Sequence, residues 1–215
     1  GWPALFLPPP PELLGMSLWF AGSAVGPELA ARWALDDASA AAWLVTSVQL
    51  GFVAGTAIAA ILNLADIVPS KRYFAASAIL AAAANAGLLA APGFEVAIAL
   101  RFATGLCLAG VYPPAMKMAS TWFRHGRGFA IGTVVGALTI GKATPYLVQA
   151  LRVDVSTVIL VASAGALLAA ALVLGGYADG PHPFAARPFS WGLVATVARV
   201  RRWRLATAGY LGHMF

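Results

Sequence analysis

The amino-acid sequence predicts an all-α integral membrane protein. Of its 215 residues, 60% are hydrophobic and only 10% are charged, whereas a soluble domain carries about 25% charged residues. The mean hydropathy is +0.81, and the polar side chains are too few to cover a globule that faces water. These values exclude a soluble enzyme, a nucleic-acid-binding module and a disordered tail. The single cysteine, Cys107, excludes a disulfide framework and a cysteine-rich metal site, and we expect no cofactor.

Six apolar runs, separated by polar or proline-bearing breaks, predict six membrane-spanning helices of about 20 residues or more. They cover residues 13–31, 43–64, 73–91, 94–122, 129–151 and 155–175. The first ends near Arg32, the second stops at Asp66, and the third stops at the turn formed by residues 91–93. The fourth is broken late by the prolines at positions 113–114, and a polar break at 152–154 separates the fifth from the sixth.

The basic residues give the orientation of these spans, because cytoplasmic loops collect Lys and Arg. Ten of them lie at the ends of the second, fourth and sixth spans: Lys71, Arg72, Lys117, Arg124, Arg127, Arg187, Arg199, Arg201, Arg202 and Arg204. Only Arg32 and Arg152 lie at the opposite breaks. We therefore expect a multi-pass protein of the plasma or inner membrane with a cytoplasmic amino terminus. The arginines at 199–204 are interpreted as an orientation signal close to anionic lipid, not as a nucleic-acid site.

Three segments follow from this reading. Residues 1–178 form the six-helix transmembrane part, residues 179–204 form a central cytoplasmic loop, and residues 205–215 begin a seventh span. This last segment is too short to cross a membrane, which needs about 20 apolar residues. The chain also begins at Gly1 without a methionine, so we expect a fragment, with a naturally half-size protein as the alternative.

Glycine pairs spaced four residues apart occur in three of the spans. They are Gly22 and Gly26, Gly51 and Gly55, and Gly132 and Gly136. Each pair lies on one helical face, where small residues let two helix backbones approach closely. We expect tight helix packing at these positions.

The break between the second and third spans carries a recognisable motif at residues 64–72. Its Asp66, Lys71 and Arg72 resemble the loop 2–3 signature of the Major Facilitator Superfamily, written G-x-L-a-D-r-x-G-r-[KR], although other positions depart from it. The fourth span adds an arginine-and-glycine motif at residues 101–105 that is similar to the one in the same helix of that family. The resemblance covers essentially the whole chain.

This resemblance implies the amino-terminal six-helix bundle of the family, built as a 3+3 inverted repeat and followed by the start of helix 7. It implies a secondary active transporter, not an enzyme, that moves a small solute by alternating access between two helical halves. The expected partners are the solute, the lipid bilayer and a missing carboxy-terminal half, with no nucleic acid. Asp66, Lys71 and Arg72 would form the conformational-gating loop that latches the halves together.

Two cations lie deep inside the predicted spans, at Arg101 and Lys142. An ionisable group at that depth normally faces a cavity or a partner, so we hypothesise a positive cavity and an anionic solute. The expected substrate-binding residues are Arg101, Lys142, Tyr112, Gln49, Trp19 and Tyr146. The competing interpretation is that Arg101 pairs structurally with Glu28 or with backbone carbonyls, that Lys142 extends to the interface, and that the aromatic residues serve packing.

Two other classes of function remain as alternatives. A six-helix intramembrane serine protease would need a nucleophile and a histidine within the spans, and spans one to six contain no histidine. A membrane subunit of a larger complex, such as a channel, would need a re-entrant loop or a pore ring, and the sequence gives no sign of either.

Overall fold

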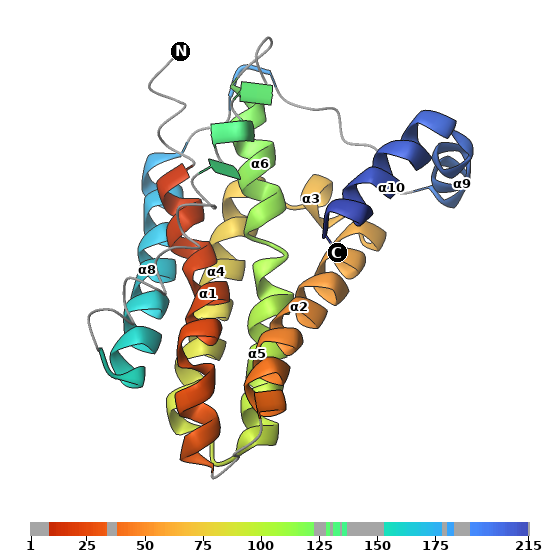
Figure 1. The fold of residues 1–215 in the computed structure, drawn as a ribbon. Coiled ribbons are helices and arrows are strands. Elements are labelled where there is room, and N and C mark those ends of the chain that lie inside the picture. The colour runs from red at the N-terminus through yellow and green to blue at the C-terminus, as the bar shows by residue number, and fades with distance from the viewer. Residues whose placement is uncertain are drawn as a thin grey trace.

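The computed structural model describes residues 9–33, 38–122, 128–129, 131–133, 135–136, 153–177, 180–182 and 190–214. This part of the chain forms helices without strands, which confirms the all-α class (Figure 1). The helices are α1 (Pro9–Arg32), α2 (Ala38–Ile61), α3 (Leu64–Ile67), α4 (Ser70–Ala86), the 3₁₀ helix η2 (Gly87–Ala90), α5 (Phe94–Leu108), α6 (Tyr112–Thr121), α8 (Val155–Gly176), α9 (Trp191–Arg199) and α10 (Arg201–Met214).

Four helical stretches of the described residues are long and apolar enough to cross a membrane. They are Ser39–Ile61, Ser70–Ala90, Phe94–Thr121 and Val155–Gly176, and they correspond to the second, third, fourth and sixth predicted spans. The first predicted span corresponds to the 24-residue helix α1. Most of the fifth lies outside the described residues. The count of six spans and the inverted repeat therefore stay predictions.

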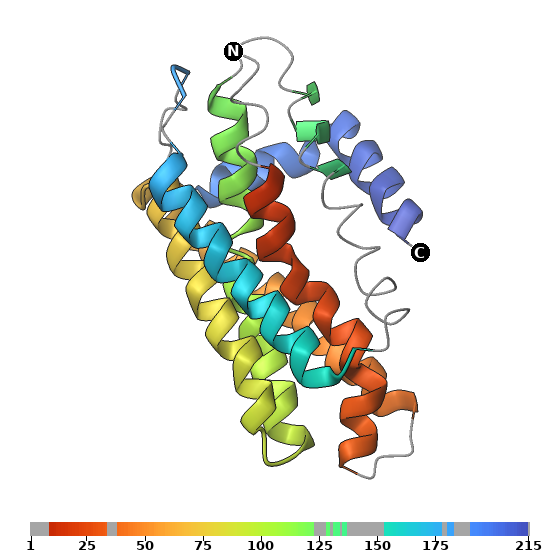
Figure 2. The same ribbon diagram turned by 90° about the vertical axis from the view of Figure 1, so that its left-hand side faces the viewer.

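The long helices pack side by side as a bundle, seen from two directions in Figures 1 and 2. Helix α1 lies against α8 and α2, helix α4 lies against α8 and α5, and α2 lies against α5. Helices α1 and α4 begin, and α6 and α8 end, at the end of the bundle that carries Lys71, Arg72 and Lys117. We call this end of the bundle the basic end.

Helix α2 ends three residues earlier than its apolar run predicts. Asn63 has φ 54° and ψ 35°, the left-handed conformation that commonly terminates a helix. The chain then turns through α3, a single helical turn that carries Asp66 at the basic end. The residue that stops the second span is therefore Asn63, and Asp66 belongs to a separate short helix.

The fourth span is interrupted ahead of its two prolines, between α5 and α6. Pro113 and Pro114 have no backbone N–H, so neither can donate the helical hydrogen bond to the carbonyl four residues earlier. The regular pattern resumes where the N–H of Ala115 donates to the carbonyl of Val111 at 3.1 Å. A Cβ on Gly110, inside the interruption, would overlap the hydroxyl of Ser77, so the break also brings α4 close.

The glycines of α2 form the tightest helix contact in the described bundle. A Cβ on Gly51 would overlap the carbonyl of Phe102, and one on Gly55 would crowd the carbonyl of Leu106. Across the interface, a Cβ on Gly105 of α5 would overlap the carbonyl of Val48. The two backbones can touch only because these three positions lack side chains.

The other two glycine pairs differ from this one. A Cβ on Gly22 would overlap the guanidinium of Arg101, whereas one on Gly26 would make only ordinary contact with Ala41. Around Gly132 and Gly136, no described atom lies within 4 Å of an added Cβ.

Candidate functional site

A buried polar cluster lies inside the bundle, centred on Arg101 of α5. The side chain is fully buried, although it carries a charge and five N–H donors. Its guanidinium occupies the space left by Gly22 of α1, where a Cβ would collide with three guanidinium atoms. Gly22, the first residue of that predicted glycine pair, thus leaves the space that the arginine fills.

The guanidinium of Arg101 donates hydrogen bonds to three neighbouring helices. Nη1 donates to the carbonyl of Leu18 at 3.1 Å, and Nη2 donates to the carbonyl of Trp19 at 3.1 Å, both on α1. Nε donates to the carbonyl of Leu44 on α2 at 3.4 Å. Nη1 also donates to Oδ1 of Asn85 on α4 at 3.4 Å. Four bonds therefore bind α5 to α1, α2 and α4.

Asn85 extends this cluster to α8. Its side chain is fully buried, and its amide nitrogen donates to the hydroxyl of Ser163 at 3.0 Å and to the carbonyl of Ile159 at 3.3 Å. Arg101 and Asn85 together connect all five long helices of the described bundle. Because a buried polar group is costly unless it is hydrogen-bonded, the cluster favours one register of these helices over others.

The other predicted substrate-binding residues are spread over the bundle. Trp19 is half-buried, and its ring packs edge-on against Phe52 with 5.2 Å between ring centroids. Gln49 is exposed on α2, and Tyr112 is half-buried at the start of α6. The main-chain carbonyl of Trp19 accepts a hydrogen bond from Arg101.

Three further residues were expected in or near this site from the sequence. Lys142 and Tyr146 lie outside the described residues. Glu28 is exposed near the end of α1 and is not among the hydrogen-bond partners given for Arg101.

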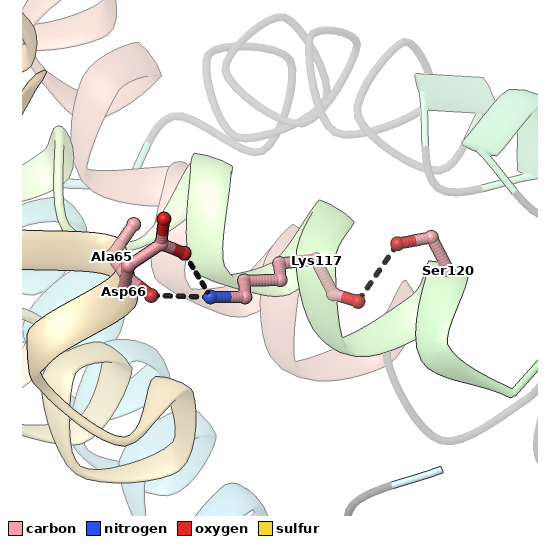
Figure 3. A network of polar contacts seen from close by, with 4 residues as sticks. All are labelled: Ala65, Asp66, Lys117 and Ser120. Atoms are coloured by element: carbon pink, nitrogen blue, oxygen red, sulfur yellow. Dashed lines mark hydrogen bonds and ion pairs between the residues drawn. The ribbon is translucent and has the colours of Figure 1, made fainter. Parts of the chain in front are cut away.

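A second polar site lies at the basic end, where α3 meets α6. Nζ of Lys117 lies 2.7 Å from Oδ1 of Asp66 and also donates to the carbonyl of Ala65 at 2.5 Å (Figure 3). The hydroxyl of Ser120 donates to the carbonyl of Lys117 at 2.8 Å. The side chains of Lys117 and Asp66 are 25% and 23% exposed, so water reaches both members of the ion pair.

The ends of α4, α6 and α8 are joined beside this ion pair. Nζ of Lys71 donates to the carbonyl of Tyr177 at 3.2 Å. The hydroxyl of Tyr177 donates to the carbonyl of Met118 at 3.1 Å and lies 3.2 Å from the hydroxyl of Thr121. The backbone N–H of Gly180 donates to Thr121 at 3.3 Å. The segment after α8 is therefore tied to the end of α6.

The three predicted gating residues thus occupy different surroundings. Asp66 is paired with Lys117, Lys71 holds the end of α8, and Arg72 is exposed on the first turn of α4. In the described part of the chain, no three His, Cys, Asp or Glu side chains come together as metal ligands would.

Three residues that organise these sites were not predicted as site residues from the sequence. Lys117 entered only as an orientation charge, although its place at the end of a span, opposite the aspartate of the loop motif, is a usable signal. Asn85 was detectable as an amide within an alanine-rich run. Tyr177 gave no signal, because its role depends on where α6 ends.

The chain matches a protein-family model. The family model described as Major Facilitator Superfamily matches residues 13–215. The matched range contains both polar sites and nearly every described residue. The search of curated proteins found no match.

Proposed function

Because this chain belongs to the Major Facilitator Superfamily, we propose that it forms the amino-terminal half of a transporter that works by alternating access. Membership of the family makes the protein a multi-pass membrane protein and a secondary transporter of a small solute. The match over residues 13–215 is the observation that carries this conclusion. The solute site of such transporters lies at the interface of two helical halves.

The ion pair between Asp66 and Lys117 is the proposed gating element. Asp66 stands at the position of the loop motif through which the family latches its two halves. Its carboxylate is fixed by Lys117 at the basic end, yet it remains partly exposed. In the proposed cycle, the second half competes with Lys117 for this carboxylate, and the exchange biases the equilibrium between inward-facing and outward-facing forms.

The proposed solute is a small anion, with Lys142 as the residue that binds it. Four of the five N–H groups of Arg101 donate hydrogen bonds to three main-chain carbonyls and to the side-chain carbonyl of Asn85. This arrangement favours a helix-positioning role for Arg101, and it leaves Lys142 as the intramembrane cation that faces the solute. Tyr146, four residues after Lys142 in the sequence, together with Trp19, Gln49 and Tyr112 completes the proposed lining.

Binding and uptake by the complete transporter test this proposal. We would measure the thermal stabilisation of the purified protein by small carboxylates and inorganic oxyanions, alongside neutral and cationic solutes. The stabilising solute would then be followed into proteoliposomes. We expect an anion to bind, Lys142→Met to abolish its binding and uptake, and Lys142→Arg to retain both.

Two outcomes would count against the proposal at different levels. Unchanged anion uptake by Lys142→Met would remove Lys142 from the site. Stabilisation and uptake of a neutral or cationic solute alone would leave the transporter but overturn its proposed anion selectivity.

A further inference from the structure

Helix α9 stands apart from the bundle and has a conspicuously exposed apolar surface. Figures 1 and 2 show α9 and α10 beside the bundle, toward the basic end. Trp191 is 70% exposed and Leu193 is 56% exposed, and only Val197 of α9 is half-buried. The helix is nevertheless well formed, because the hydroxyl of Ser190 caps it by accepting the N–H of Leu193 at 3.4 Å.

The apolar residues of α9 gather on one side of the helix. At 100° per residue, Trp191, Val194 and Ala198 share one face, and Leu193 and Val197 widen it. The remaining narrow face carries Gly192, Thr196 and Arg199. A helix of nine residues is far too short to cross a bilayer. Its apolar face must therefore contact some other apolar surface.

The charged residues that flank α9 indicate the chemical nature of the surface it contacts. Four exposed arginines lie at or just beyond the end of α9, namely Arg199, Arg201, Arg202 and Arg204. The chain contains no Asp or Glu from residue 180 to residue 215, so nothing within this segment neutralises them. An apolar face, an amphipathic Trp and uncompensated arginines next to membrane spans together match an anionic lipid surface.

We propose that α9 is an interfacial helix that binds the anionic surface of the bilayer crossed by the bundle. Trp191, Leu193 and Val194 enter the boundary between headgroups and acyl chains, while the arginines contact lipid phosphates. The helix then lies along the membrane surface and anchors the segment between α8 and α10. This contact is independent of which solute the transporter carries.

Site-specific fluorescence on the complete, reconstituted protein tests the position of α9. In a Cys107→Ala background, a single NBD probe is placed at Val194→Cys, at the centre of the apolar face, or at Thr196→Cys on the polar face. The vesicles contain phosphatidylcholine with or without phosphatidylglycerol. Quenching by doxyl-labelled lipid reports contact with the bilayer, and quenching by iodide reports contact with water.

With phosphatidylglycerol present, we expect the Val194→Cys probe to be quenched by doxyl lipid and shielded from iodide. The Thr196→Cys probe should show the reverse, which makes it the matched control. Replacing Arg199 and Arg201 with Gln leaves Arg202 and Arg204 to fix the orientation. This double variant should lower the ratio of membrane-bound to free α9 by about 25-fold, or about fivefold per arginine.

Three results would overturn the proposal. Equal exposure of both probes to iodide would mean that α9 is not inserted. A Val194→Cys probe shielded from iodide but untouched by doxyl lipid would mean that α9 packs against protein. Equal insertion with and without phosphatidylglycerol, unaffected by the arginine variant, would exclude recognition of anionic lipid.

Discussion

Arg101 shows how a single side chain can hold a charge inside an apolar bundle. Helix carbonyls keep a second lone pair after accepting their own helical hydrogen bond, and Arg101 uses this spare capacity at Leu18, Trp19 and Leu44. The planar guanidinium points its donors in several directions at once, which an ammonium group at the end of a flexible chain does not do. The charge is therefore dispersed over dipoles on two other helices.

Replacing Arg101 with Lys should destabilise the protein despite the conserved charge. An ammonium group has three donors and cannot reach Leu18, Trp19 and Leu44 together, so buried groups lose their partners. We expect a loss of about 3 kcal/mol, seen as a lower thermal unfolding midpoint in detergent. Arg72→Lys, at an exposed position, is the control and should leave the midpoint unchanged. An Arg101→Lys variant as stable as the parent would refute this role.

The ion pair at the basic end should matter for transport more than for stability. Its members are partly exposed, and such pairs contribute only about 0–1 kcal/mol to stability. We therefore expect Asp66→Asn and Lys117→Met each to slow uptake severalfold while shifting the unfolding midpoint little. The charge-swapped double variant, Asp66→Lys with Lys117→Asp, should recover part of the uptake. If the loss of uptake in the double variant equals the sum of the two single losses, the ion pair itself does not support transport.

The residues of these sites were only partly predictable from the sequence. Arg101 and Asp66 could be predicted as site residues, because a charge within an apolar run and an aspartate in a loop motif can both be recognised in the sequence. The competing interpretation named backbone carbonyls as partners of Arg101, and three of them do accept its hydrogen bonds. Which carbonyls accept could not be predicted, because a main-chain acceptor carries no residue signature. Lys117 could be counted, but its pairing depends on the turn at Asn63 that sets the position of α3.

At the scale of elements, the apolar runs predicted the helices well and their ends less well. The second and fourth spans match stretches of the described chain that are apolar enough to cross a membrane. Their interruptions depend on local chemistry that hydropathy does not contain. Asn63 adopts a left-handed conformation, and the two prolines remove hydrogen-bond donors, so the break lies before them. Hydropathy reports burial, whereas helix ends are decided by backbone conformation.

The contact between α2 and α5 should not tolerate a side chain. Gly51→Val would place three carbon atoms against the carbonyl of Phe102, where even a Cβ overlaps. We expect a loss of about 2 kcal/mol or more from overpacking, measured as a lower unfolding midpoint. Gly175→Ala is the matched control, because open space surrounds Gly175 within α8. That variant should be neutral or stabilising by up to about 1 kcal/mol. Equal midpoints for Gly51→Val and the parent would contradict the tight contact.

At the scale of the whole molecule, the bundle has two chemically distinct ends. Lys71, Arg72 and Lys117 mark the basic end, whereas the opposite end carries the turn at residues 91–93 and the exposed Glu95. The orientation in the membrane was predicted from the same uneven distribution of basic residues. The described helices place these residues at opposite ends without reference to any membrane, so the charge asymmetry is a property of the folded molecule.

Cysteine labelling in intact cells checks the predicted orientation of the two ends. In a Cys107→Ala background, Pro92→Cys should react with a membrane-impermeant maleimide added outside the cells. Ile67→Cys, also at an exposed position, on α3 at the basic end, should react only after permeabilisation, because basic loops remain in the cytoplasm. Labelling of Ile67→Cys from outside, with Pro92→Cys protected, would invert the topology.

The main-chain acceptors around Arg101 have a consequence for how this protein tolerates mutation. A carbonyl is supplied by whichever amino acid occupies positions 18, 19 and 44, so a substitution there keeps the hydrogen bonds to Arg101. What limits positions 18 and 44 is the packing of their buried leucine side chains. Position 101 has no such freedom, nor does position 22, which must stay without a side chain. A saturation library should therefore show a sharp asymmetry. One arginine and one glycine would be nearly irreplaceable, while positions 18 and 44 would accept apolar residues of similar volume.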